Sequence, residues 1–244
     1  MIEAIQNWFA PPRHLILLVI ALWFGWWLAE RIVKREGKVH EAAFSNLTFY
    51  GLLAFVIGGR VLYALDNLAV FSLSPLSIFS PNPQLFDPFF AGTAAIVTML
   101  VYGQRAKLPF WQTLDALTPL LAALMLGLGA AHLAEGSAFG RETSLPWGIA
   151  VDGVTRHPSQ VYETVFAFFI LNLIGTRGPL PHAGAQFLTF LAWTSAARLF
   201  LEAFRGDSVL IFGSLRLGQI LAWAVLAVAF LALNRLQSKE QLAN

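Results

Sequence analysis

The sequence has no cysteine and little charge. Without a thiol, the chain can form no disulfide framework and no zinc thiolate site, and it has no cysteine nucleophile of its own. Charged residues make up only 12% of its 244 positions, whereas hydrophobic residues make up 57% and aromatic residues 14%. Because the hydrophobic residues fall in long runs, this composition is typical of a protein that spans the lipid bilayer.

The sequence also lacks the pattern of a metal site or of a nucleic-acid-binding surface. Its five histidines lie at positions 14, 40, 132, 157 and 182 with no spacing typical of metal ligands, so we predict no metal and no other cofactor. The net charge is only +2, and membrane topology explains how the basic residues are distributed. We therefore expect no nucleic-acid partner.

Seven apolar segments predict an all-α integral membrane protein with seven transmembrane helices. The first run follows an acidic and aromatic stretch, so we interpret it as a retained span rather than a signal peptide. Residues 66–87 contain Pro and alternating Phe and Leu without a basic residue, which predicts a segment lying in the membrane interface. We expect one transmembrane domain over residues 1–244, with spans at roughly 14–33, 44–65, 88–104, 112–134, 160–175, 183–204 and 216–235.

Assigning the loops alternately to two sides separates the lysines from most arginines. One side receives Arg31, Lys34, Arg35, Lys38, Arg105, Lys107, Arg177, Arg235 and Lys239. The positive-inside rule makes this side cytoplasmic, so the N terminus is expected outside and the C terminus inside. The outer loops are then 66–87, 135–158 and 205–215, and the outer side has only arginines: Arg13, Arg60, Arg141, Arg156, Arg198, Arg205 and Arg216.

An outer face with Arg and no Lys favours phosphate binding, because the guanidinium fork binds phosphate through two hydrogen bonds. The alternative is that the absence of lysine is due to chance and that the outer arginines only extend to the lipid headgroups. The densest polar stretch is "RHPSQVYE" at 156–163, which follows the Gly- and Pro-rich loop 135–158. This loop is a candidate cap over a site, and the polar residues after Pro158 are expected to face a cavity or a neighbouring helix.

Three smaller patterns add candidates. Arg198 and Glu202 are four residues apart, so we expect them to pair on one helix face, and Arg205 is left to bind a ligand. His132, with Glu135 three residues later, is a candidate base with an orienting carboxylate, although a histidine at a helix end is more often only a polar residue with satisfied hydrogen bonds. Arg60, after two glycines, either binds an anionic headgroup or marks a helix-packing notch.

Six motifs in this order resemble those of the prolipoprotein diacylglyceryl transferase family: "GGRVLY" at 58–63, "GSAFGR" at 136–141, "LPWGI" at 145–149, "RHPSQVYE" at 156–163, "EAFRGD" at 202–207 and "LGQIL" at 217–221. The resemblance implies an enzyme of the bacterial plasma (inner) membrane with multiple spans. Such an enzyme moves the diacylglyceryl group of phosphatidylglycerol to the lipobox cysteine of a prolipoprotein and releases glycerol phosphate. The missing cysteine then belongs to the substrate, and the partners are the phospholipid and the prolipoprotein signal peptide.

The resemblance also implies roles for single residues. Arg156 and Arg205 are expected to bind the phosphate, and Arg60 and Arg141 to hold the headgroup or a loop. Further substrate-binding candidates are those that order the pocket or lie in the matching motifs: Tyr63, Gly140, Gln160, Tyr162 and Glu163.

Two family motifs are changed in this chain. Phe90-Ala91-Gly92 stands where the family has His-Gly-Gly, and "LGAAH" at 128–132 stands where it has Gly-Arg-Leu-Gly-Asn, so that the family's Arg falls on Gly129 and its Asn on His132. We hypothesise that His132 replaces the missing base and acts with Arg205 in catalysis. The alternative is a non-catalytic or repurposed paralogue that binds anionic phospholipid or a lipoprotein signal peptide.

Overall fold

The computed structural model describes residues 8–9, 13–80, 82–151, 153–176, 178, 180–211 and 213–241. Arg177, assigned above to the cytoplasmic side, lies outside the described residues. The chain forms two compact units, and each is described by itself. Unit 1 contains Met1–Arg31 and Leu114–Asn244, and unit 2 contains Ile32–Thr113.

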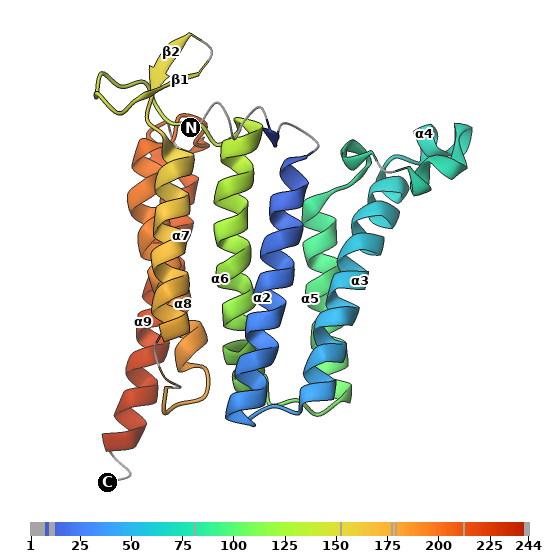
Figure 1. Cartoon of the computed structure of the whole chain (residues 1–244), viewed down its shortest axis with the longest axis vertical. Helices are drawn as coiled ribbons and strands as arrows, with labels where there is room; N and C mark the ends of the chain where they lie inside the picture. Colours follow the sequence, from blue (N-terminus) through green and yellow to red (C-terminus); the bar gives the residue numbers. More distant parts are fainter. Residues whose placement is uncertain are drawn as a thin grey trace. The chain divides into compact units, whose positions relative to one another are not determined.

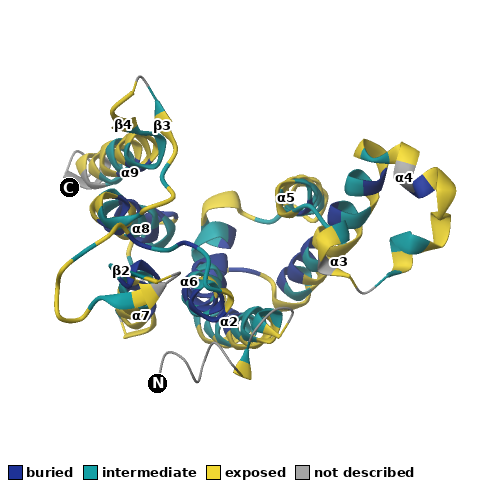
Figure 2. Ribbon diagram, turned by 90° about the horizontal axis from the view of Figure 1, so that it is seen from above, coloured by how far each residue is buried: buried dark blue, intermediate teal, exposed yellow. Residues whose placement is uncertain are grey.

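Unit 1 is built from long helices that run alongside one another (Figure 1). They are most of α2 (His14–Glu36), α6 (Phe110–Glu135), α7 (Ser159–Thr176), α8 (Ala185–Leu201) and α9 (Leu217–Gln241). Glycines allow close packing: a Cβ atom added to Gly25 of α2 would lie 2.8 Å from the Cβ of Ala123 in α6, and one added to Gly129 of α6 would lie 2.6 Å from Oγ1 of Thr164 in α7. Figure 2 shows buried residues concentrated on α6, the helix at the centre of this packing.

The core of unit 1 is apolar and lies among α6, α7 and α8. Its buried residues are Ala122, Ala123, Ile170, Leu171, Ile174, Phe190 and Ala197. At the lower end in Figure 1, Asp115 of α6 fixes the start of α8, because its carboxylate accepts the backbone N–H of Gly184 at 2.6 Å and of Phe187 at 2.9 Å. These contacts satisfy amides that α8 cannot pair internally.

Short elements gather at the upper end of unit 1, where α6 and α8 finish and α7 and α9 begin (Figure 1). They are an antiparallel hairpin of β1 (Ile149–Val151) and β2 (Val154–Arg156), a second hairpin of β3 (Leu210–Ile211) and β4 (Leu215–Arg216), and the 3₁₀ turn η3 (Glu202–Phe204). The described parts of the expected loops 135–158 and 205–215 therefore each contain one short pair of antiparallel strands.

Unit 2 is a pair of packed helices with a folded connection. Helix α3 (Glu41–Asp66) packs on α5 (Pro88–Arg105), where a Cβ atom on Gly58 would lie 2.3 Å from the Cβ of Ala94. In its described residues, the segment between them contains the short helices α4 (Leu68–Leu73), η1 (Pro75–Phe79) and η2 (Pro83–Leu85), none of which is long enough to cross a bilayer. Asp87 caps α5 by accepting the N–H of Phe89 at 2.7 Å and of Phe90 at 3.0 Å.

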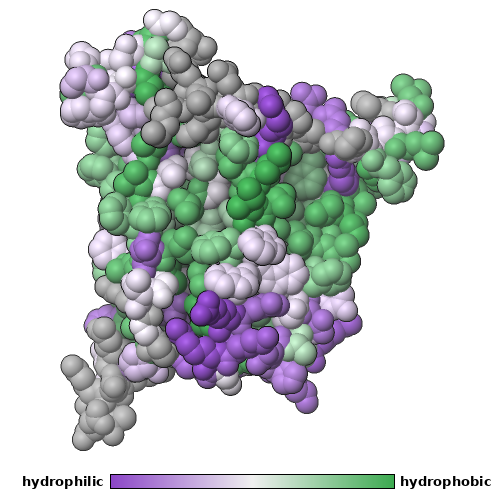
Figure 3. All heavy atoms as spheres, viewed as in Figure 1, coloured by the Kyte–Doolittle hydropathy of each residue, from purple (hydrophilic) through white to green (hydrophobic). Residues whose placement is uncertain are grey.

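All seven segments predicted as spans are helical. Among the residues that the structure describes, five helices are long and apolar enough to cross a membrane: Leu15–Glu36, Glu41–Asp66, Phe110–Glu135, Ala185–Phe204 and Leu217–Leu236. Helices α5 and α7 have 18 residues each and fall outside that set. Figure 3 shows hydrophobic surface along the helices and hydrophilic surface toward their ends. The chain is thus an all-helical multi-pass membrane protein with two small hairpins.

Candidate functional site

Glu163 of α7 is the centre of a charged cluster at the upper end of unit 1. Its Oε1 accepts a hydrogen bond from Nη1 of Arg205 at 2.9 Å and lies 3.5 Å from Nη1 of Arg198, while its Oε2 lies 3.4 Å from Nδ1 of His132. The Glu163 side chain is only 15% exposed. One carboxylate therefore joins α6, α7 and the end of α8, as expected for a charge that is costly to bury unless paired.

The guanidinium of Arg205 forms hydrogen bonds with two carboxylates. Besides the bond to Glu163, its Nε and Nη2 donate to the two carboxylate oxygens of Asp207 at 2.9 and 2.7 Å. Burial opposes ionisation of Asp207, but the hydrogen bonds and charge of Arg205 outweigh burial and hold the pKa of Asp207 below its ordinary value. Burial likewise opposes the charge on Arg205, but Asp207 and Glu163 together raise the pKa of Arg205. Three of the five N–H donors of this guanidinium are thus paired, and a phosphate that reaches Arg205 meets two neighbouring carboxylates.

The predicted ion pair between Arg198 and Glu202 is confirmed, with 3.0 Å between Nε and Oε2. Glu202 is 2% exposed, and α9 approaches it at Gly218, where a Cβ atom would lie 2.6 Å from the carboxylate carbon. Nη1 of Arg216 donates to the backbone oxygen of Glu202, to that of Arg205 at 3.0 Å and to Oγ of Ser208 at 2.7 Å. Arg216 therefore fixes the turn that presents Arg205.

The start of α7 clamps the preceding loop. Oγ of Ser159 donates to the backbone oxygen of Ala138 at 2.6 Å, and Nε2 of Gln160 donates to that of Ser137 at 2.8 Å. Ser159 and Gln160 are each 1% exposed. Ala138 has φ 54°, a left-handed conformation that a non-glycine residue rarely adopts, and these bonds hold it there.

Two glycines bring the loop against the turn that carries Arg205. Gly140 forms a β-bridge with Arg205, and the N–H of Gly206 donates to the backbone oxygen of Phe139 at 3.0 Å. A Cβ atom on Gly140 would lie 2.1 Å from the backbone oxygen of His157, so only glycine allows this approach. The motifs "GSAFGR", "RHPSQVYE" and "EAFRGD" thus meet at one end of unit 1. Gly140 is required there by the close approach of the His157 backbone.

The two loop arginines differ in how free they are. Arg156 stacks its guanidinium 5.0 Å from the centre of the Phe139 ring, donates to the backbone oxygen of Gly140 at 3.5 Å and lies 4.0 Å from Glu142. Arg141 is exposed, and its backbone bonds to Phe204, but its guanidinium makes no hydrogen bond or ion pair with the residues that the structure describes. Arg141 is therefore the more accessible of the two for an anion.

Glu135 does not orient His132, which corrects the sequence hypothesis. The carboxylate of Glu135 accepts a hydrogen bond from Oγ of Ser137 at 2.8 Å, while the carboxylate beside His132 is that of Glu163. Glu135 is the last residue of α6, where the chain turns into the loop. The spacing of three residues placed both side chains on one helix face, but no local pattern could reveal a partner 31 positions away.

Tyr162 belongs to an aromatic group above α7. Its hydroxyl accepts a hydrogen bond from Nε1 of Trp147 at 2.8 Å, and its ring lies 5.9 Å from that of Phe204. His157 packs 5.1 Å from the same Phe204 ring. These contacts tie the hairpin loop to α7 and to the end of α8.

Arg60 and Tyr63 lie in unit 2. Nη2 of Arg60 donates to the backbone oxygen of Asn82 at 2.8 Å, and the Tyr63 ring lies 6.2 Å from that of Phe71. These contacts hold the early and the late part of the 66–87 connection against α3. Their expected role in substrate binding stays a prediction.

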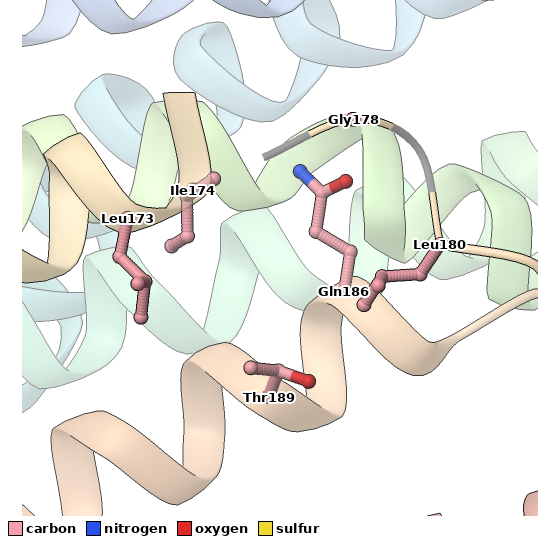
Figure 4. A pocket seen from close by; sticks show the side chains of 6 residues that line it. All are labelled: Leu173, Ile174, Gly178, Leu180, Gln186 and Thr189. Carbon is pink, nitrogen blue, oxygen red and sulfur yellow. The ribbon is translucent and has the colours of Figure 1, made fainter. Parts of the chain in front are cut away.

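A shallow pocket lies at the opposite end of α7 and α8 (Figure 4). It contains none of the predicted site residues and is lined by Leu173, Ile174, Gly178, Leu180, Gln186 and Thr189. Among the residues that the structure describes, no three His, Asp or Glu side chains gather in a group that could hold a metal ion. The cluster around Glu163 at the upper end is therefore the candidate functional site.

The motifs at the upper end of unit 1 lie within a longer stretch of sequence that matches one protein family. The sequence profile described as prolipoprotein diacylglyceryl transferase matches residues 13–235. The chain belongs to this family. Relatives named phosphatidylglycerol–prolipoprotein diacylglyceryl transferase include one from Photobacterium profundum, which is 34% identical over 221 residues and covers 85% of this chain and 82% of its own length.

Two further relatives of the same name show how far the family likeness extends. The Vibrio cholerae protein is 32% identical over 232 residues, covering 88% of this chain and 83% of its own length. The Nostoc protein is 25% identical over 241 residues, covering 89% and 82%. The match therefore includes the membrane helices and all of the motif-bearing loops, and the chain is a member of a membrane transferase family.

Within the prolipoprotein diacylglyceryl transferase family, this chain has packed its α6–α7 crossing tightly. A Cβ atom on Gly129 would lie 2.6 Å from Oγ1 and 3.1 Å from Cα of Thr164. The position that resembles the family's arginine therefore has no room for a side chain. Phe90, at the position that resembles the family's histidine, lies in the first turn of α5 and offers no ionisable group.

Proposed function

We propose that this chain transfers the diacylglyceryl group of phosphatidylglycerol to the lipobox cysteine of a prolipoprotein. The observation that carries the proposal is the contact of His132, Arg198 and Arg205 with one carboxylate, Glu163. It supplies cations for a phosphate and a titratable imidazole within one cluster. Membership of the family and the names of the relatives supply the substrates.

We further propose seven spans in the bacterial plasma membrane, with the N terminus outside and the C terminus in the cytoplasm. An 18-residue helix is about 27 Å long, close to the roughly 30 Å thickness of the hydrocarbon core, which supports α5 and α7 as the two additional spans. The upper end of unit 1 then faces outward, where a secreted prolipoprotein and the headgroups of the outer leaflet are available. The lysine-free outer side supports this orientation.

The proposed reaction forms one bond to carbon and breaks one. The thiol sulfur of the prolipoprotein attacks the phosphate-bearing carbon of the diacylated glycerol, a thioether forms, and the bond from that carbon to the phosphate oxygen breaks. His132 accepts the thiol proton, which then passes to the departing glycerol phosphate. Arg205, with Arg198 beside it, stabilises the charge that develops on the phosphate after displacing Glu163 or Asp207.

The other predicted residues support this step from the loops. Arg141 has an exposed guanidinium that suits a headgroup phosphate, and Arg156 orders the loop through Phe139 and Gly140. Gln160 and Tyr162 hold the loop and hairpin in place. Arg60 and Tyr63 lie in unit 2, and an anionic lipid headgroup is their proposed ligand there.

The test measures glycerol phosphate release and peptide mass together, with the full-length protein in phosphatidylglycerol bilayers and a lipobox-containing peptide. His132→Asn is the informative variant, because Asn keeps a hydrogen-bond donor of similar reach but cannot accept the proton. We expect its turnover to fall by about 10²-fold or more. His132→Ala should fall as far, and Arg205→Ala should abolish release.

A specific observation favours a second function. Because Gly129 and Phe90 leave the chain without two ionisable family residues, it is also suited to bind anionic phospholipid or a lipoprotein signal peptide without chemistry. Phosphatidylglycerol binding that is lost in Arg205→Ala, with no glycerol phosphate released by the wild type, would establish this function. Turnover unchanged in His132→Asn would instead remove His132 from the reaction.

A further inference from the structure

The corner that leads into the β1–β2 hairpin exposes a large apolar side chain. Trp147 is 57% exposed and the nearby Leu145 is 37% exposed. The only polar atom of the Trp147 side chain, Nε1, already donates to the hydroxyl of Tyr162 at 2.8 Å. The polar edge of the indole thus faces the protein, and the exposed part of the ring is apolar. None of the proposed chemistry uses Trp147 or Leu145.

Trp147 extends an aromatic ridge that runs along α7. Tyr162, Phe166 and Phe169 are spaced by four and three residues, so they share one helix face. Phe166 is 36% exposed and Phe169 is 64% exposed, which identifies this face as one that the protein leaves to the surrounding medium. Because Trp147 bonds to Tyr162, the hairpin corner lies at the end of this ridge, where α7 leaves its apolar stretch.

A lipid surface fits this corner better than a protein partner. A stable protein interface buries on the order of 1,000 Å² or more, which a single Trp and its neighbours cannot supply. Trp and Tyr with one wet and one apolar edge are instead enriched at the boundary between membrane and water. The exposed guanidinium of Arg141, four residues before Leu145, is suited to the phosphates at the same depth.

We propose that the Leu145–Trp147 corner is a membrane anchor that inserts into the headgroup and acyl boundary of the phospholipid leaflet around the upper ends of the helices. The anchor fixes the depth of loop 136–157, which is bridged to Arg205 through Gly140. It therefore holds the Glu163 cluster at the level of the lipid headgroups. The inference rests on the proposed placement of α7 in the membrane and does not require transferase activity.

The absence of cysteine makes the test direct, since any engineered cysteine is the only thiol in the chain. Leu145→Cys would carry a nitroxide label in the full-length protein, reconstituted in phosphatidylglycerol and phosphatidylcholine vesicles. Collision rates with oxygen, which dissolves in lipid, and with a water-soluble nickel chelate report the depth of the label. Phe169→Cys is the reference inside the membrane, and Thr155→Cys, exposed on β2 of the same hairpin, is the aqueous reference.

We expect the oxygen-to-nickel collision ratio at Leu145 to be several-fold higher than at Thr155 and lower than at Phe169. In the Leu145→Cys background, Trp147→Ala should shift the label toward the aqueous value, whereas Trp147→Phe should keep it immersed because the ring remains apolar. Equal ratios at Leu145 and Thr155 would overturn the anchor. Equal shifts in the Ala and Phe variants would attribute the depth to the hydrogen bond with Tyr162 and would also overturn it. A water-exposed label at Phe169 would overturn both the anchor and the span.

Discussion

Nη1 of Arg205 lies 2.9 Å from Oε1 of Glu163, and this contact joins two motifs that are 42 positions apart in the sequence. Both side chains are largely sheltered, with 12% and 15% exposure. An arginine expected to bind phosphate is therefore already paired with a carboxylate. An anionic lipid that binds Arg205 competes with the carboxylates of Glu163 and Asp207. The affinity for the lipid therefore depends on these two carboxylates.

Glu163→Gln should separate binding from turnover. Removing the negative charge beside Arg205 removes repulsion against a phosphate, so we expect the Kd for phosphatidylglycerol to fall several-fold. The same change removes the charged partner of His132, so we expect turnover to decrease. Titration with phosphatidylglycerol in mixed micelles and an assay of glycerol phosphate release measure the two effects. Weaker lipid binding by Glu163→Gln would show that Glu163 helps to organise the phosphate site and does not compete for it.

Asp207 should make stability depend on pH only in strong acid. Its pKa is held below the ordinary value of 3.8, so the folded protein binds the proton less readily than the unfolded chain does. Its contribution is complete above about pH 4 and is lost as the pH falls through the lower folded value. We expect the Tm difference between wild type and Asp207→Asn to be constant from pH 7 to about pH 5 and to shrink below pH 4. A difference that grows in acid would contradict this assignment.

Hydropathy alone predicted the helices, because each apolar run long enough to span also satisfies its backbone hydrogen bonds best as a helix. The Arg198–Glu202 pair was also predictable, since residues four apart on a helix are neighbours. The outer loops were predicted only as loops. Their hairpins depend on contacts such as that of Gly140 with the backbone of His157, which no local pattern encodes.

The sequence predicted which residues belong to the site, but it did not predict which of their side chains contact Glu163. Glu163 was expected to order the pocket, yet its contacts with His132 and Arg198 join three helices whose relative rotation the sequence does not give. Glu135 was assigned to His132 because short spacing is the only partner signal available within one helix. No sequence pattern indicated that Arg216 fixes the turn that presents Arg205, because its three hydrogen-bond acceptors lie 8 to 14 positions away across a turn.

Arg216→Lys should loosen the turn that presents Arg205. A lysine ammonium cannot reproduce the planar guanidinium contacts with Glu202, Arg205 and Ser208. We expect faster amide hydrogen exchange in a peptide covering residues 202–208, with no change in α6, and a higher KM for phosphatidylglycerol. Arg35→Lys is the matched control, because Arg35 forms an ion pair with Glu36 at the C-terminal end of α2. Unchanged exchange in residues 202–208 would show that the turn is held without Arg216.

Gly218→Ala should destabilise unit 1 because the first turn of α9 lies directly against a buried carboxylate. The added Cβ atom would lie 2.6 Å from Cδ of Glu202 and 2.7 and 2.8 Å from its oxygens, and the Glu202 carboxylate is buried and paired with Arg198. Overpacking of this kind costs about 1–3 kcal/mol. Gly175→Ala is the control, since it is also helical in unit 1 and a Cβ atom there meets no atom within 4 Å. Thermal unfolding in detergent should show a lower Tm for Gly218→Ala and an equal or higher Tm for Gly175→Ala, because alanine is the better helix former. Equal Tm values for the two variants would mean that α9 can move away from Glu202 without loss of stability. The packing of α9 would then not be needed to hold the Arg198–Glu202 pair.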